Sequence, residues 1–182
     1  LRDSLKIIKN AKETENLYPK NDPSQNVYLV PAFVGLGAPY WDGEARGALF
    51  GLTRNTGIPE LVKATLDSVV YQTKDLISAM EKDSGIKIKK IKVDGGMVSN
   101  NQFVQFLSNL LMCVCLRPKI NETTSLGAAY LAGYQSGIIK KFTDINQKWK
   151  SEKKFVNKMN RKDIEKLYLG WQKAIKGALK VK

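Results

Sequence analysis

The pair of glycines in residues 92–101 (KVDGGMVSNN) is the clearest sign of chemistry in this sequence. Gly95 and Gly96 leave the backbone without Cβ atoms, so a ligand can approach the main chain closely there. Asn100 and Asn101 follow at the start of an expected helix, where an amide can cap free N–H groups or bind the edge of a heterocyclic ring. The pattern indicates non-covalent nucleotide binding, although an Asp-Gly-Gly sequence by itself is more often an ordinary turn.

Two carboxylates beside glycine-rich segments, Asp42 and Asp94, are the candidates for a catalytic base. We interpret both as structural: Asp42 would brace the loop at 34–46, and Asp94 would fix the turn before the two glycines. The sequence has no histidine, which removes the commonest general base. We therefore predict no catalytic residue within these 182 residues.

The two cysteines, Cys113 and Cys115, lie in an expected strand at 112–116. Residues two apart in a strand point to the same face and are poorly placed for a disulfide. With no histidine and only these two thiols, a zinc site is not expected, and we predict no metal site in the chain. Reduced thiols and the lack of a visible signal peptide favour a cytoplasmic location.

The chain is strongly basic, with a net charge of +13 carried by 25 lysines and only 5 arginines. One interpretation is a basic module that binds nucleic acid. We favour a solvated lysine surface, because the lysines occur mostly singly or in pairs and the arginine forks of nucleic-acid readers are scarce. An anionic ligand such as ATP would be attracted to that surface. No apolar run approaches the roughly 20 residues of a membrane span.

The elements around the glycine pair predict where it would lie. Residues 86–93 read as a strand, 100–111 as an amphipathic helix and 112–116 as a second strand. Short links between them imply a parallel crossover, with a ligand site at the carboxyl end of the first strand. Apolar residues at helical spacing predict three further helices, at 59–84, 124–135 and 161–179.

The first part of the chain is expected to differ from the rest. Residues 1–12 read as a helical stub and 13–26 as a polar loop, so we predict that 1–26 continues from an N-terminal region missing here and that 27–182 forms the domain. Leu1 stands inside the helical pattern, which suggests a piece of a longer protein. Two early strands without a helix between them suggest antiparallel pairing; they are at 27–33 and 47–52. The expected fold is an α/β domain, a mixed sheet flanked by helices.

Several segments follow one another in a recognisable order. They are residues 30–42 (VPAFVGLGAPYWD), 45–54 (ARGALFGLTR), 60–67 (ELVKATLD), 93–96 (VDGG), 122–133 (ETTSLGAAYLAG) and 168–174 (YLGWQKA). Together they resemble the C-terminal domain of the FGGY carbohydrate kinases, and the first two resemble the glycerol kinases within that family. The resemblance covers nearly the whole chain.

This resemblance implies an actin-like, ribonuclease-H-like domain that closes on an N-terminal partner domain, with ATP between them. In such kinases Gly96 and Asn100 match positions that contact the nucleotide, and Gly95 lies in the same turn. The predicted nucleotide-binding residues are therefore Gly95, Gly96 and Asn100.

The family reaction is the transfer of a phosphoryl group from Mg-ATP to glycerol, giving glycerol 3-phosphate and ADP. The resemblance places the base, the glycerol-binding residues and most Mg²⁺ contacts in the missing N-terminal region, so this chain alone is expected to be inactive. It also implies a homo-oligomer for the full-length protein. Another FGGY sugar kinase, for xylulose or gluconate, is the alternative, although those relatives tend to carry a Gly-Glu-Arg-type loop in place of residues 38–42.

Other conspicuous residues have structural interpretations. Tyr40 is expected to anchor its loop and Trp171 to lie in the core. The small residues from Gly127 to Gly133 are expected to form a close helix-packing face.

Overall fold

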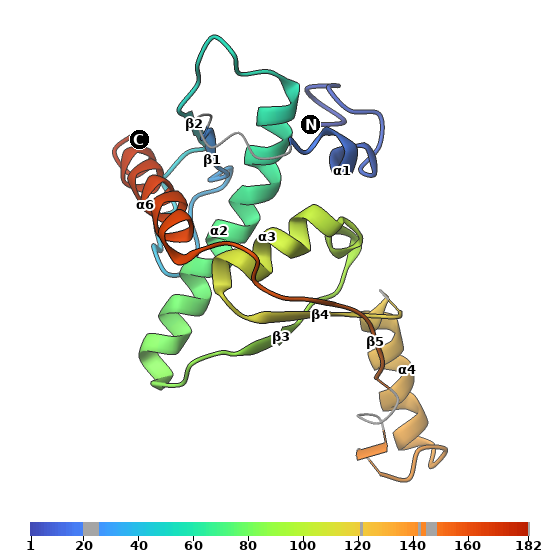
Figure 1. Ribbon diagram of the computed structural model, residues 1–182. Helices are drawn as coiled ribbons and strands as arrows, with labels where there is room; N and C mark the ends of the chain where they lie inside the picture. The colour runs from blue at the N-terminus through green and yellow to red at the C-terminus, as the bar shows by residue number, and fades with distance from the viewer. Residues whose placement is uncertain (20–25, 121, 142, 145–148, 182) are drawn as a thin grey trace.

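The computed structural model describes residues 1–19, 26–120, 122–141, 143–144 and 149–181, and it is an α/β structure (Figure 1). The elements in chain order are α1 (Glu13–Leu17), β1 (Tyr28–Val30), β2 (Ala48–Phe50), α2 (Ile58–Ser84), β3 (Lys90–Lys92), the 3-10 turn η1 (Gly96–Ser99), α3 (Asn101–Leu111), β4 (Val114–Pro118), α4 (Thr123–Gln135), β5 (Ser151–Phe155) and α6 (Arg161–Ala178).

In the described residues the strands form two sheets, and the three-stranded one is the mixed sheet that the sequence predicts. β1 and β2 pair antiparallel, as expected. In the other sheet, β4 lies between β3, to which it is parallel, and β5, to which it is antiparallel. Helix α3 connects β3 to β4 and so forms the predicted parallel crossover. β5 was not expected, because its sequence, SEKKF, is charged and only Phe155 is buried; the strand is held by pairing with β4.

The core lies between α2, α3, α6 and β1, with α2 through its middle (Figure 1). Tyr71 of α2 stacks on Trp171 of α6, with ring centroids 5.1 Å apart, and meets Phe106 of α3 edge-on at 5.6 Å. Trp171 is fully buried, which confirms its predicted place in the core. The aromatic cluster fixes the three helices against one another, since such pairs add to the free energy of apolar burial.

The ends of α2 show why the sequence forms this long helix. The Gly57 N–H donates to Glu60 Oε2 at 2.7 Å, which completes a capping interaction at the first turn. Gly85 adopts a left-handed conformation with φ of 70° and ends the helix. Both ends agree with the predicted helix at 59–84.

The first residues differ from the prediction. Residues 1–12 contain no helix, and the short helix α1 instead occupies 13–17, inside the expected loop. Asn10 explains the shift, because its Oδ1 accepts from the N–H groups of Lys12 and Glu13, at 3.0 and 3.2 Å. The rest of the expected loop, residues 20–25, lies outside the described residues. Helix α1 lies against α2 and α3.

Helix α4 extends away from the other helices (Figure 1). None of its residues is buried, and a Cβ at Gly127 would meet no atom within 4 Å. The expected close helix packing over 127–133 is therefore wrong for this structure: Gly133 meets only the side chain of Ile139. In the described part of the chain, no helix combines the length and the apolar character needed to cross a membrane.

Candidate functional site

The glycine pair lies in an open turn immediately after β3. The Val93 N–H donates to the Leu116 carbonyl at 3.0 Å and ties the end of β3 to β4. A Cβ built on Gly95 or on Gly96 would meet no atom within 4 Å. The two glycines therefore present bare backbone to open space, at the strand end where ligands bind in α/β sheets.

The two glycines differ in what their backbones require. Gly95 has φ of 92° and ψ of 177°, a conformation that is essentially restricted to glycine. Gly96 begins η1 and its φ lies outside the positive range. Neither conformation nor packing among the described residues demands glycine at position 96.

Asn100 caps the first turn of α3, which is one of the two roles predicted for its side chain. Its Oδ1 accepts from the Phe103 N–H at 3.0 Å, and its Nδ2 donates to Thr14 Oγ1 at 3.2 Å. The residue is 8% exposed. Because both ends of the amide bond the protein itself, Asn100 supports the turn from within, while Gly95 and Gly96 supply its open surface.

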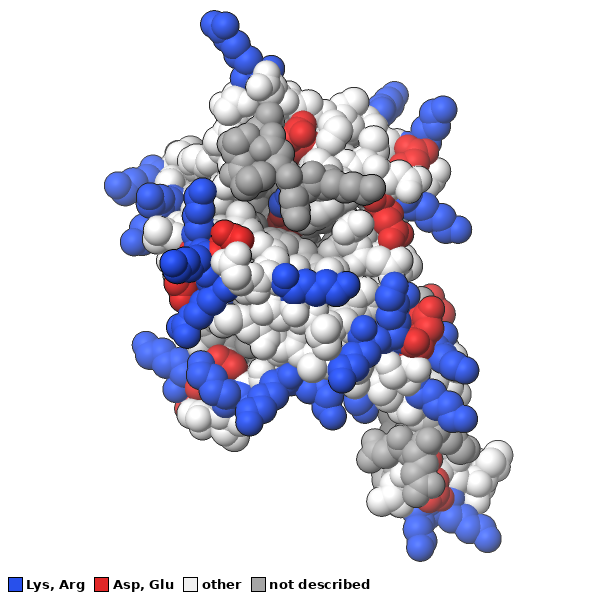
Figure 2. Space-filling model, in the orientation of Figure 1, with Lys and Arg blue, Asp and Glu red and all other residues white. Residues whose placement is uncertain are grey.

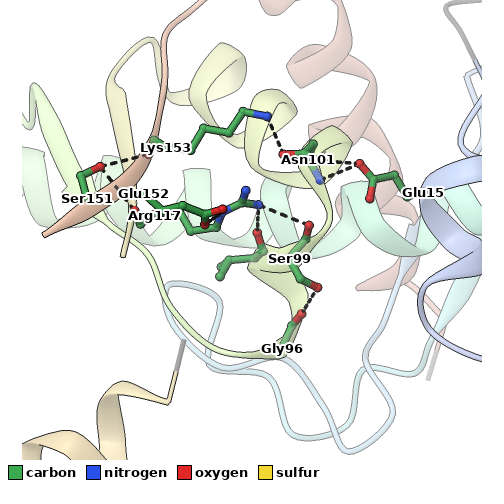
Figure 3. A network of polar contacts seen from close by, with 9 residues as sticks. Glu15, Gly96, Ser99, Asn101, Arg117, Ser151, Glu152 and Lys153 are labelled. Carbon is green, nitrogen blue, oxygen red and sulfur yellow. Dashed lines mark hydrogen bonds and ion pairs between the residues drawn. The ribbon is translucent and has the colours of Figure 1, made fainter. Parts of the chain in front are cut away.

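Asn101 links α3 to two other elements (Figure 3). Its backbone N–H and its Nδ2 both donate to Glu15 Oε1, at 3.2 and 2.8 Å. Its Oδ1 accepts from Lys153 Nζ of β5 at 2.8 Å. Asn100 and Asn101 together therefore hold α1 against the start of α3.

Arg117 is a site residue that sequence reasoning missed. It lies in β4, is only 6% exposed, and its Nη1 donates to the Val98 carbonyl at 2.8 Å (Figure 3). Its Nε forms an ion pair with Glu152 of β5 at 2.9 Å. The sequence contained one sign of this role, because Arg117 directly follows the apolar run at 113–116. An arginine in a buried strand is almost always paired, so its position could have predicted a structural partner.

The two aspartates predicted to be structural behave differently. Asp42 Oδ1 accepts from the N–H groups of Glu44 and Ala45, at 2.9 and 3.0 Å, so it braces its loop as predicted. Asp94 is exposed, and among the described residues no hydrogen bond or ion pair holds it. The expectation that Asp94 fixes the turn is therefore wrong, because Arg117 and Asn100 hold the turn instead.

A buried carboxylate that the sequence did not reveal anchors the loop at 34–46. Asp75 of α2 is 4% exposed and accepts from Tyr40 Oη at 2.8 Å, Tyr168 Oη at 2.5 Å and Trp171 Nε1 at 2.7 Å. Burial, and then the negative charge of Asp75, raise the pKa of Tyr40 above its ordinary value. Tyr40 is thus the loop anchor that the sequence predicts.

Metal-binding groups are scarce in the described ranges, where no cluster of three or more histidine, cysteine, aspartate or glutamate side chains could hold an ion. Cys113 and Cys115 are free and buried, which agrees with their prediction as unpaired thiols. The hydrogen bond that the Cys115 thiol donates to Cys113, followed by burial, raises the pKa of Cys115 above its ordinary value.

The basic residues are distributed over the molecule. Figure 2 shows lysine and arginine side chains around the rim of the visible face and along the lower edge of the main body, with acidic side chains among them, while the centre of this face is mostly uncharged.

Comparison with known proteins identifies relatives of the whole chain. The profile of the FGGY family of carbohydrate kinases, C-terminal domain, matches residues 3–136. A glycerol kinase of Geobacillus sp. (strain WCH70) is 51% identical over 182 residues, which are 100% of this chain and 37% of the relative. The chain thus spans little more than a third of the length of that relative.

Solved structures share the fold. A crystal structure of Plasmodium falciparum glycerol kinase with ADP has a TM-score of 0.86 and 32% identity over 98% of this chain and 36% of that one. Xylulose kinase from Lactobacillus acidophilus has a TM-score of 0.75 over 99% of this chain and 37% of that one, but at 24% identity it is similar in fold alone. These kinases confirm the predicted α/β class with its actin-like, ribonuclease-H-like fold.

Proposed function

Because the chain belongs to the FGGY family of carbohydrate kinases, we propose that it is the C-terminal, nucleotide-binding part of a glycerol kinase. In this proposal the whole protein transfers the terminal phosphoryl group of ATP to glycerol, and residues 1–182 bind the adenosine end of ATP or ADP. The bare backbone of Gly95 and Gly96 is the observation that carries it, because it lies open directly after β3, at the strand end where ligands of α/β proteins bind.

Three features support nucleotide binding at this turn. The glycine pair follows a parallel strand, at the edge of the sheet where ligands of α/β proteins bind. Gly96 and Asn100 match the positions that contact nucleotide in the FGGY kinases. A structurally similar glycerol kinase has been solved with ADP. We infer that the adenosine lies against the main chain of Gly95 and Gly96, and that Asn100 supports it by fixing the start of α3.

The acceptor side of the reaction lies elsewhere in this proposal. Phosphoryl transfer depends mainly on positioning and charge stabilisation, so the groups on each side of the nucleotide can come from different domains. The described residues hold no group of metal-ligating side chains, and Mg²⁺ would be held largely by residues outside this chain. A coupled assay with glycerol and ATP should therefore detect no turnover from the 182-residue chain alone, and glycerol-dependent ADP release would contradict this division.

We propose glycerol as the phosphoryl acceptor, rather than xylulose or gluconate. The 51% identity to a glycerol kinase extends over the whole chain, whereas the xylulose kinase from Lactobacillus acidophilus is similar in fold alone. We also propose that the full-length protein is a cytoplasmic homo-oligomer. Sedimentation of the full-length protein would test its oligomeric state.

The direct test is an ADP titration by calorimetry, comparing the native chain with Gly96→Val. The Cβ of a valine at Gly96 would meet no atom within 4 Å, so we expect ADP binding to be lost while the unfolding free energy stays nearly unchanged. Gly37→Val is a matched control, since Gly37 also faces open space and has no positive φ, but it lies in the other loop. Equal ADP affinity for the native chain and Gly96→Val would remove Gly96 from the site.

A further inference from the structure

A buried guanidinium lies directly behind the glycine turn. Arg117 is 6% exposed, and a buried charge is costly unless it is paired and hydrogen-bonded. Its Nη1 donates to the carbonyls of Val98 and Ser99, at 2.8 and 3.3 Å, and its Nε pairs with Glu152. The guanidinium also lies 5.5 Å from the ring centroid of Phe155. Among the described residues, two of the three hydrogen bonds that Arg117 donates therefore go to the backbone of a single turn.

That turn is η1, which begins at Gly96. Ser99 Oγ donates to the Gly96 carbonyl at 2.7 Å, and the Val98 N–H donates to the Gly95 carbonyl at 3.3 Å. The two residues that Arg117 holds, Val98 and Ser99, are thus each hydrogen-bonded to one of the two glycines. A shift of Val98 or Ser99 should therefore move Gly95 and Gly96 as well. Arg117 joins the open backbone to the sheet, since it is itself part of β4 (Figure 3).

An irregularity in the sheet brings the neighbours of Arg117 into place. The pairing of β4 with β5 shifts register between Arg117 and Pro118, so that Glu152 is the extra residue between Lys153 and Ser151. Such bulges re-aim side chains. Here Glu152 accepts from the Arg117 Nε and Lys153 donates to Asn101, so consecutive residues of β5 bond the arginine that holds the turn and the first residue of α3.

We propose that Arg117 is a positioning residue for nucleotide binding, which sets the backbone of Gly95 and Gly96 for the adenosine without touching it. The inference rests on the proposed nucleotide function of this turn. The guanidinium holds the two carbonyls through Nη1 and Glu152 through Nε, so two nitrogens are needed for the full set of bonds. Lysine in its place keeps the positive charge but has one nitrogen on a flexible chain, so it cannot hold the turn and Glu152 in the same planar geometry, and the turn should relax. The turn would then fold with a less well-defined surface for the ligand.

The test uses the 182-residue chain labelled with ¹⁵N, titrated with ADP by calorimetry and observed by NMR. Arg117→Lys should shift the amide signals of Gly95 and Gly96 and weaken ADP binding about tenfold. Glu152→Gln should act in the same direction and more weakly, since Glu152 is half-exposed and its loss leaves the carbonyl bonds in place. Lys154→Gln, on the same strand, should change neither measurement.

A control for stability separates positioning from simple loosening of the fold. Asp75→Asn should lower the unfolding free energy while ADP affinity and the signals of Gly95 and Gly96 stay as in the native chain. If Arg117→Lys does not fold, Glu152→Gln against Lys154→Gln decides the question. Unmoved Gly95 and Gly96 signals, or native ADP affinity, in the Arg117 and Glu152 variants would overturn the proposal. A native chain that binds no ADP would instead overturn the proposed function, and shifted glycine signals would still show that Arg117 sets the turn.

Discussion

Two glycine-rich segments of the described chain, the loop at 34–46 and the turn at Gly95 and Gly96, differ in what surrounds Gly35 and Gly96. In the loop at 34–46, a Cβ on Gly35 would lie 2.6 Å from the Gly43 Cα and 2.7 Å from the Asp42 carbonyl oxygen. In the turn that holds Gly96, the same added atom would meet nothing within 4 Å. The first loop uses a missing side chain to pack against itself, whereas the second leaves room for something else.

The two loops are also anchored differently. The loop at 34–46 sends its own side chain, Tyr40, to the buried carboxylate of Asp75. The turn at Gly96 buries only Val98 among its four residues, and Arg117 of β4 donates to the backbone carbonyls of Val98 and Ser99. Its polar anchor therefore comes from another element, whereas the loop at 34–46 supplies its own. The same glycine-rich composition therefore predicts stability effects in one region and ligand effects in the other.

The largest effect should come from removing the anchor of the first loop. Asp75→Ala leaves the buried Trp171 Nε1 without an acceptor and removes charged partners from two tyrosines, so the unfolding free energy should fall by about 4 kcal/mol. Urea unfolding followed by tryptophan fluorescence measures this. Asp83→Ala, an exposed acid on the same helix, should change the value by less than about 0.5 kcal/mol. Equal effects for the two variants would refute the anchor.

A smaller effect should follow from crowding the first loop. Gly35→Ala combines a positive φ of 93° with backbone contacts under 3 Å, so it should cost about 2–4 kcal/mol. Gly37→Ala, in the same loop, meets no atom within 4 Å and should be neutral or slightly stabilising. A neutral Gly35→Ala variant in urea unfolding would show that this loop does not pack against itself.

In the turn at Gly95 and Gly96, substitutions at two adjacent residues should affect different properties, namely the unfolding free energy at Gly95 and ADP binding at Gly96. Gly95→Ala forces an alanine into a conformation nearly restricted to glycine and should cost about 1–3 kcal/mol. Gly96→Ala should leave the unfolding free energy within about 0.5 kcal/mol of native, yet weaken ADP binding measured by calorimetry. The comparison between the loops fails if Gly96→Ala destabilises the fold as much as Gly95→Ala does.

The sequence predicted the parts of this structure that depend on neighbouring residues. The helices α2, α3 and α6 follow from apolar spacing along the chain, and the glycine turn follows from two adjacent residues. Arg117 and Asp75 were missed as anchors because their partners are far away in sequence: Val98 is 19 residues from Arg117, and Trp171 is 96 residues from Asp75. β5 was missed because it has almost no buried side chains of its own. The spacing of apolar residues along the chain predicts which residues are buried, but it does not predict which distant groups a buried charged side chain will bond.

The smallest effect concerns the hydrogen bond between Tyr40 and Asp75, and pH makes it visible. Tyr40→Phe should lower the unfolding free energy by about 1 kcal/mol at pH 8, since the variant lacks the hydroxyl that donates to the Asp75 carboxylate. Burial and the Asp75 charge raise the pKa of Tyr40 above the ordinary value near 10. The folded state then keeps the phenol proton at pH values where the unfolded chain has lost it.

The stabilisation from Tyr40 is therefore complete below about pH 10 and declines as the pH rises further. Urea unfolding at a series of pH values should show the gap between native chain and Tyr40→Phe narrowing above pH 10, because the phenylalanine variant has no proton to lose there. A gap that stays constant or widens above pH 10 would mean that Tyr40 is not bonded to the Asp75 carboxylate, and the first loop would then lack the side-chain anchor that distinguishes it from the turn at Gly96.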